Sequence, residues 1–271
     1  SGNKRIVAPN IRPFDVIKMA TKESVSKFFS NPNYLFFETM TGYHFRSLSS
    51  LYAQTPKQFY TQYVHGSSIE NGAVNIEKEL ANILDFEIIE NSNSLTNYTI
   101  GVYASNLIVH DIFSKSHKKY QYGIFNNFQK ENHITSHHKQ DDFPIYSHLV
   151  VDDKGRTVED FPARTFVTPT STYSIGSSFD AQHTTENNTS PYTAPNAQDW
   201  LQSRTSQLIQ LEQGLVSNIL THGNTVVSAG DIVKLDIPYS AAFKTTKNEK
   251  NDRFYKGMFF VKRLRHDFDF G

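Results

Sequence analysis

The sequence predicts an α+β fold in which antiparallel β-structure predominates and about three helices are segregated from the strands. Three segments carry helix signals, over residues 12–29, 74–89 and 197–213. The strand-like segments are rich in Val, Ile, Tyr and Phe and are separated by turn-forming residues. The sequence does not show the regular alternation of strands and helices that predicts a parallel α/β sheet.

The first predicted helix is followed by a β-hairpin. Pro13 suits the first turn of the helix over 12–29, and Asn31-Pro32-Asn33 ends it. In the stretch LFFETMTGYHFRSLSSL (35–51), a three-residue turn at 40–42 would pair Glu38 with His44 and Phe37 with Phe45. A two-residue turn at Thr41-Gly42 would instead oppose Glu38 to Phe45 and mix the two faces. We therefore prefer the three-residue turn.

The preferred register gives the hairpin one polar face and one aromatic face. It places Glu38, His44 and Arg46 together, opposite Phe37, Tyr43 and Phe45. A Glu–His pair could act in proton transfer. However, the stretch contains no nucleophile and no oxyanion device. We interpret these three side chains as a cross-strand or subunit contact, and we predict no catalytic residues.

The middle of the chain combines a helix, a second hairpin and two polar segments. The helix over 74–89 is predicted from apolar residues with helical spacing, at Ile76, Leu80, Ile83 and Leu84. The residues at 98–113 are strongly β, with 118–125 as their expected hairpin partner, and two short strands are expected near 145–151 and 164–168. The segments 126–142 and 169–196 are polar and are predicted to be loops.

The last part of the chain predicts one helix and three strands. Asn196 is a suitable N-cap for the helix over 197–213, which Gly214 ends. On this helix, Trp200 and Arg204 are four residues apart, so both can lie at one packing seam. The strands are predicted at 215–223, 231–238 and 257–270. In the last strand, Arg263 and Arg265 share a face and could deter edge pairing or meet an acidic protein partner.

Composition excludes several classes of protein. The balance of 27 basic against 27 acidic residues gives no overall basic field, so non-specific nucleic-acid binding is not expected. The absence of cysteine excludes disulfides, thiolate zinc sites and a cysteine nucleophile. No run of 18 apolar residues is present, so no membrane partner is predicted. The opening Ser1-Gly2 suggests the scar of a cleaved tag, and we expect a fragment of a longer protein.

The histidine-rich stretch HITSHH is the strongest candidate for metal binding. His133 and His137 are four residues apart, with Asp141 and Asp142 nearby. Thr135 and Ser136 favour helix poorly, and a metal site also needs further ligands and a supporting shell. We interpret the stretch as a solvated loop and predict neither a metal nor a cofactor.

Six stretches, in order along the chain, carry a resemblance to a known family. They are IRPFDVIKMA (11–20), YLFFETMTGYHFRSLSSL (34–51), GVYASNLIVHDIFSKS (101–116), WLQSRTSQLIQLEQ (200–213), GNTVVSAGDIVKLDIP (223–238) and GMFFVKRLRHDF (257–268). Together they cover about a third of the chain, and the set resembles the baseplate hub proteins of contractile-tailed phages of the T-even type.

The resemblance implies a structural role in the virion. Hub proteins of this family carry two tube-like β-barrel domains per subunit and form a homotrimer that joins the tail tube to the central spike. DNA passes through the lumen as cargo, and the family implies no enzyme activity. On this basis we expect a helix–hairpin–helix mixed region over 1–96 and a tube-like β domain over 97–271, in a fragment lacking most of a first barrel. In that domain, 98–125 and 215–270 would build one barrel or sheet.

Two alternative functions are kept. A carbohydrate- or receptor-binding β protein of the tail is suggested by the high content of Tyr, Asn and Thr, because aromatic platforms with polar rims suit sugars. A metal-dependent hydrolase would use the histidine-rich stretch and the acids near it.

Overall fold

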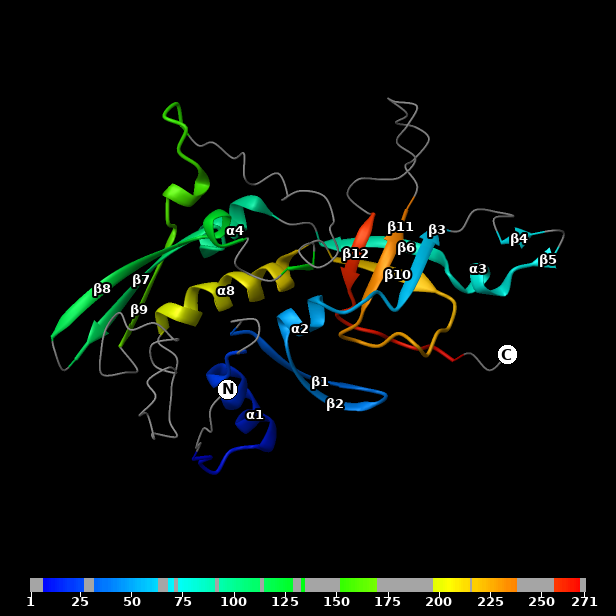
Figure 1. The fold of residues 1–271 in the computed structure, drawn as a ribbon, viewed down its shortest axis with the longest axis horizontal. Coiled ribbons are helices and arrows are strands. Elements are labelled where there is room, and N and C mark those ends of the chain that lie inside the picture. The colour runs from blue at the N-terminus through cyan, green and yellow to red at the C-terminus, as the bar shows by residue number, and fades with distance from the viewer. Residues whose placement is uncertain are drawn as a thin grey trace, which may run out of the picture.

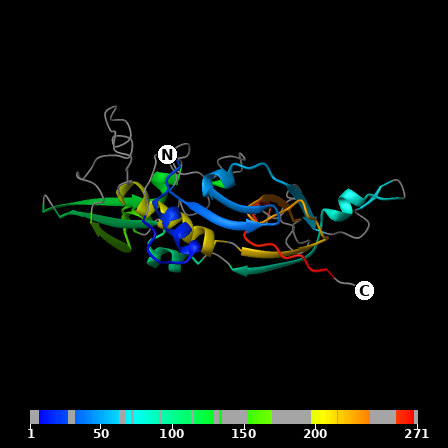
Figure 2. The ribbon, with the colours of Figure 1, turned by 90° about the horizontal axis from the view of Figure 1, so that it is seen from below.

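The computed structural model describes residues 7–26, 32–62, 68–70, 73–90, 93–112, 115–128, 133–134, 152–169, 197–214, 216–237 and 256–268. The fold is α+β, as predicted, with more strand (38%) than helix (28%). Figure 1 shows two main sheets at opposite ends of an elongated molecule, with one long helix running between them. Figure 2 shows the same arrangement from below.

The N-terminal elements form a helix beside a hairpin. Helix α1 (Pro13–Glu23) has proline in its first turn, as predicted. Strands β1 (Tyr34–Thr39) and β2 (Gly42–Ser47) form the hairpin, and β2 runs directly into the short helix α2 (Leu48–Tyr52). The Ser47 side chain accepts a hydrogen bond from the backbone of Ser50 and caps α2.

The hairpin is present, but its predicted register is wrong. The turn consists of Met40 and Thr41 only, so that Glu38 pairs with Tyr43 and Phe37 pairs with His44. Gly42 is the first residue of β2, with φ +125, and is not the third residue of the turn. The prediction separated polar from aromatic side chains, whereas both faces of the real hairpin carry aromatic rings that pack against other elements.

The larger sheet has five strands in the order β10-β6-β3-β11-β12 and is a mixed half-barrel. The strands are β10 (Val216–Thr221), β6 (Asn82–Glu90), β3 (Gln58–Gln62), β11 (Ile232–Asp236) and β12 (Gly257–Phe260). Strand β3 is parallel to both of its neighbours, and the two outer pairs are antiparallel. The buried core of this five-stranded sheet comprises Tyr60, Ile83, Val227, Val233, Leu235 and Ile237.

The smaller main sheet has three strands in the order β8-β7-β9. Strands β7 (Ala104–Asp111) and β8 (Ser116–Gly123) form the predicted hairpin, and β9 (Arg164–Pro169) lies parallel to β7. Helices α4 (Ser94–Ile100) and α5 (Ile124–Phe128) and the 3₁₀ turn η2 (Val158–Asp160) lie at the end of the sheet where β7 begins and β8 ends. Gly101 ends α4 in the left-handed conformation, with φ +86.

Helix α8 (Ala197–Gln213) is confirmed over its predicted range and is the long helix between the sheets. Figure 2 shows α1 in front of α8, with the hairpin extending from there toward the half-barrel. Beyond the half-barrel, a small ribbon of β4 (Ile69–Glu70) and β5 (Ala73–Val74) projects together with α3 (Ile76–Leu80).

Three predictions about the middle and end of the chain need correction. The helix predicted over 74–89 is largely strand, because α3 ends at Leu80 and β6 follows. The alternation of apolar and acidic residues from Leu84 to Ile88 is a strand signal, and pairing with β10 outweighs the helical spacing. Residues 98–100 belong to α4 rather than to a strand. Strand β12 ends at Phe260, well short of residue 270.

The two expected domains do not correspond to the two sheets. The half-barrel combines β3 and β6, from the region 1–96, with β10, β11 and β12. Strands β7 and β8 form a separate sheet with β9, so the expected single barrel from 98–125 and 215–270 is wrong. The strand expected near 145–151 and the loop interiors at 135–142 and 170–196 lie outside the described residues.

None of the helices in the described part of the chain has the length and apolar character needed to cross a membrane.

Candidate interaction surface

One face of the hairpin joins helix α1 to form an exposed group of five aromatic rings, Phe14, Tyr34, Phe36, Tyr43 and Phe45, here called the aromatic face. Phe36 lies between Phe14 and Tyr43, with ring centroids 5.9 and 5.7 Å away. Tyr34 stacks on Phe45 at 5.0 Å. Tyr43 is 63% exposed and Phe14 56%, and Met40 at the turn is 75% exposed. Large apolar groups gathered on one surface are typical of a contact site.

The opposite face of the hairpin is fastened to the half-barrel. Phe37 stacks on His44 with ring centroids 5.3 Å apart and packs directly over Gly230. Arg46 donates one hydrogen bond to Gln54 Oε1 and another to the Ser50 carbonyl, both at 3.1 Å. Gln54 in turn donates to the Gly230 carbonyl at 2.9 Å. The hairpin is therefore held at its back while its aromatic face points outward.

The structure separates the three residues predicted to share the polar face. His44 and Arg46 lie on the half-barrel side of the hairpin, and Glu38 lies on the aromatic face beside Tyr43. His44 Nε2 is 2.8 Å from Thr39 Oγ1, a contact across the turn. The geometry therefore gives no Glu–His pair, and the candidate acid–base set is removed.

Trp200 and Arg204 are brought together at a buried seam between α8 and α1. The Arg204 guanidinium lies 4.5 Å from the centre of the Trp200 ring. It donates to the Pro32 carbonyl, from Nε at 3.0 Å and also from Nη2, and from Nη1 to the carbonyl of Lys22. Longer bonds reach Thr21 and Ser24 at 3.4 and 3.3 Å. The cation thus caps the C-terminal end of α1, where exposed carbonyls favour positive charge.

Other polar side chains of α8 fasten the three-stranded sheet. Gln202 Nε2 donates to the Ser105 carbonyl at 2.9 Å, and Ser206 Oγ donates to the Val102 carbonyl at 2.9 Å. Gln207 accepts a bond from the side chain of Asn33 at 2.5 Å. Gln202, Ser206 and Gln207 are all buried. The polar side chains of helix α8 therefore hold α1 and the hairpin in a fixed position relative to the three-stranded sheet.

Arg263 and Arg265 lie in an exposed segment that follows β12. The predicted edge strand ends before them, and 261–268 has neither helix, turn nor bend. Arg265 Nε contacts Asp267 Oδ1 at 2.7 Å, and both side chains are largely exposed. Such a pair adds little stability, so this basic segment is available to a partner.

A polar cluster that sequence reasoning missed lies where α3 meets β6 and β10. Ser68 donates to Glu79 Oε2, Asn82 donates to both of them, and His222 Nε2 lies 3.8 Å from Glu79 Oε1. In a serine hydrolase the histidine lies between the serine and the acid, whereas here the acid lies in the middle. The cluster therefore holds α3, β6 and the end of β10 together. Because His222 is far from the other three residues in the sequence, no motif spacing predicts the cluster.

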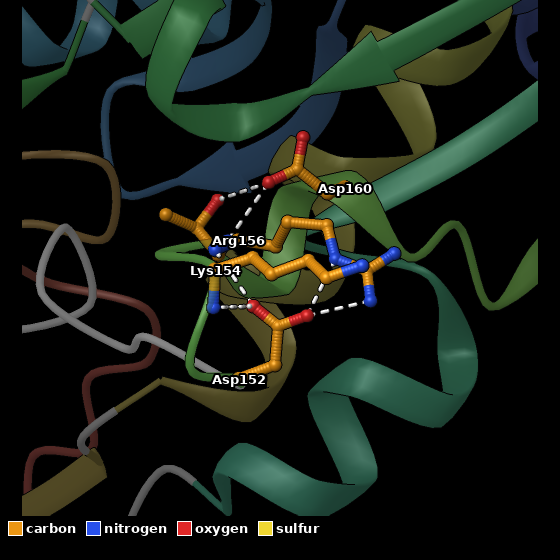
Figure 3. A network of polar contacts seen from close by, with 5 residues as sticks. Asp152, Lys154, Arg156 and Asp160 are labelled. Carbon is orange, nitrogen blue, oxygen red and sulfur yellow. Dashed lines mark hydrogen bonds and ion pairs between the residues drawn. The ribbon is translucent and has the colours of Figure 1, made fainter.

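The segment 152–160 is ordered by local ion pairs and backbone bonds (Figure 3). Asp152 accepts from the backbone of Lys154 and Arg156, and from Arg156 Nε at 2.6 Å. These contacts lower the pKa of Asp152, chiefly through the Arg156 side chain. Asp160 accepts from the Thr157 backbone at 2.8 Å and completes a capping box. The network shapes the approach to β9.

Among the described residues, no group of three or more His, Asp or Glu side chains is placed to hold a metal ion. His133 is described, but His137, Asp141 and Asp142 lie outside the described residues. The prediction that the histidine-rich stretch is a solvated loop without a metal therefore stays a prediction.

Comparison with family models, curated proteins and solved structures gives no match for this chain.

Proposed function

We propose that this chain is a structural subunit of the baseplate hub of a T-even-type contractile phage tail, and not an enzyme. In this role it resides in the virion, assembles as a homotrimer in its full-length form, and binds the tail tube protein on one side and the central spike protein on the other. DNA would meet it only as cargo in the lumen.

One observation carries the proposal: stretches that resemble hub proteins, although distant in sequence, contact one another in the fold. Phe14 meets Phe36, and Phe37 packs over Gly230. The Gly230 backbone donates to the Val261 carbonyl at 2.8 Å. A fourth contact joins Gln202 of α8 to Ser105 of β7. The first three contacts join α1, the hairpin and the half-barrel, and the fourth joins α8 to the three-stranded sheet. Arg204 of α8 links the two groups by donating to the Pro32 carbonyl, between α1 and the hairpin.

The energetics of this frame support a scaffold. Its joints are buried polar contacts to backbone groups, such as those of Arg204 and Ser206, which fix one relative placement of the elements. The half-barrel sheet supports a tube-like domain whose completion needs further strands. The aromatic face supplies an apolar surface that would be covered in an assembled particle.

The test is the assembly of the full-length protein with its spike. Native mass spectrometry of the full-length protein, alone and mixed with the spike protein, should give a homotrimer and a trimer–spike complex. Tyr43→Ala combined with Phe45→Ala should leave the fold intact by circular dichroism and weaken one of these associations at least tenfold. A full-length protein that stays monomeric and ignores both spike and tube would refute the proposal.

A second candidate, binding of carbohydrate or a receptor glycan, is favoured by the exposed Tyr43 and Phe45. The planes of Phe36 and Tyr43 are within 11° of parallel, so each ring uses one flat side on its partner. Fewer ring faces are then left for a sugar to stack on, which favours the hub proposal over carbohydrate binding. Saturable binding on a glycan array that Tyr43→Ala abolishes would reverse that preference.

A further inference from the structure

The β7–β8 hairpin ends in a concentration of positive charge, here called the basic tip. It consists of the exposed side chains of His110, Lys115, His117, Lys118 and Lys119. The three lysines lie within five consecutive residues, although basic and acidic residues balance at 27 each over the whole chain. Asp111 is the one acidic residue in the sequences of β7 and β8, and it is only 4% exposed. The basic tip therefore carries a local positive field that the net charge of the chain does not reveal.

Positive side chains lie on both faces of this hairpin. Lys118 and Lys119 follow each other in β8, so their side chains point to opposite faces. Lys118 Nζ lies 5.3 Å from the centre of the Tyr120 ring, on the same face. Lys119 shares the other face with His117, which pairs directly with His110. Figure 1 shows the hairpin running out to the end of the molecule away from the half-barrel, so these charges project from that end.

Lys115 has a backbone conformation that favours glycine or asparagine. Its φ is +52, and within the described residues it is the one non-glycine residue with a positive φ. This left-handed conformation is disfavoured for a residue with a Cβ. Residues held in such conformations are concentrated at functional sites. The lysine at this position therefore indicates that its charge is used at the end of the hairpin.

We propose that the basic tip binds the phosphate backbone of double-stranded DNA. A single sheet with its side chains is about 10 Å thick, and the major groove of B-DNA is about 12 Å wide. A hairpin that enters the groove end-on therefore has a row of phosphates beside each face. Lys118 and Lys119 then meet opposite rows, with Lys115 at the end between them. The flat surface of an acidic protein would instead contact one of the two strand lysines and leave the other in water.

The recognised group is the phosphate, and no base edge is needed. Binding is therefore independent of DNA sequence and sensitive to salt. The inference goes beyond the proposed hub role, in which DNA only passes as cargo. Its test uses this chain and DNA alone, whereas the hub proposal is tested by assembly with the spike, so either can fail without the other.

Fluorescence anisotropy with a labelled duplex of about 20 base pairs and arbitrary sequence measures the binding. Because each phosphate contact contributes about −0.9 to the slope of log K against log salt, three lysines predict a slope of about −2.7. The variant Lys115→Gln/Lys118→Gln/Lys119→Gln should bind at least tenfold more weakly at low salt and lose most of this slope. An affinity of the native chain that does not depend on salt, or no binding at all, would overturn the proposal.

A matched control removes the same charge from other parts of the surface. Lys18→Gln/Lys154→Gln/Lys262→Gln replaces three exposed lysines outside the hairpin and should keep the slope of the native chain. Equal losses in the two triple variants would contradict a site at the basic tip. Labelled polyglutamate is the second probe, and it should bind more weakly than the duplex. Binding of polyglutamate as tight as that of DNA would identify an acidic polypeptide as the partner and overturn the proposal.

Replacement of Lys115 by glycine separates binding from folding. Glycine adopts φ +52 without steric strain, so thermal unfolding of Lys115→Gly should occur at the native temperature or above it. The slope of log K against log salt should nevertheless become shallower by about 0.9, because one phosphate contact is lost. Lys115→Asn, which also tolerates the left-handed conformation, should behave in the same way. Full retention of the slope in both variants would contradict the role assigned to Lys115.

Discussion

Replacement of Arg204 by alanine should destabilise the chain more than the same replacement of Arg46, Arg156, Arg263 or Arg265. Its guanidinium is the common partner of the Pro32 and Lys22 carbonyls and stacks on Trp200. Arg204 itself is only 9% exposed. The alanine variant would leave buried acceptors without their donor, at about 1–3 kcal/mol each. It would also lose a cation–π contact of about 1 kcal/mol.

We expect the free energy of unfolding to fall by about 3–5 kcal/mol in Arg204→Ala, since these terms overlap and the site relaxes in part. Arg204→Lys keeps the charge but loses the fork that reaches several carbonyls at once. It should still cost about 2 kcal/mol. A charge-only role predicts instead that lysine is nearly neutral.

Equilibrium urea unfolding followed by fluorescence provides the assay, because Trp200 is the single tryptophan and lies against Arg204. The control is Arg263→Ala, whose exposed side chain should change stability by no more than about 0.5 kcal/mol. A loss below about 1 kcal/mol in Arg204→Ala, or full retention of stability in Arg204→Lys, would refute the assigned role of the seam.

Three further predictions concern other joints of the frame. In Gly230→Ala the backbone keeps φ +90 and the added Cβ lies 2.6 Å from the Phe37 ring, so the free energy of unfolding, measured by thermal unfolding, should fall by at least about 2 kcal/mol. The control Gly155→Ala has φ +73 but open space around the added Cβ, and should lose about 1 kcal/mol. Equal losses in the two variants would contradict the clash with Phe37. Tyr60→Phe removes a buried hydroxyl that bonds to the Thr221 and Asn224 side chains, and urea unfolding should show a loss of about 0.5–1.5 kcal/mol; a more stable variant would be the contrary result. The lowered pKa of Asp152 means that its contribution to order is present above its unfolded pKa near 3.8 and is lost as pH falls through the lower folded value. Amide NMR signals of Lys154 and Arg156 should therefore shift on acidification in the native chain, and not in Asp152→Asn.

The sequence predicted those elements whose signals are local. Pro13, the Thr41-Gly42 step and the spacing within 197–213 mark α1, the hairpin and α8, and all three are present. The Trp200–Arg204 spacing also placed the two side chains together. These features depend on residues close in the chain.

The errors arose where distant packing decides the structure. Residues 82–90 form a strand because β10 pairs with them, although the helical spacing of Ile76 and Leu80 extends into this segment. The hairpin register follows from Phe37 packing on Gly230 and Phe36 packing on Phe14. No local pattern contains these contacts, so the separation of Glu38 from His44 could not be foreseen.

Cryo-electron microscopy of the full-length protein in its intact particle tests the central claim most directly. The hub assignment predicts three copies on the tail axis, between the tail tube and the spike, with the aromatic face covered by a neighbouring chain. Density for this protein away from the tail axis, or with its aromatic face open to solvent at the particle surface, would contradict it.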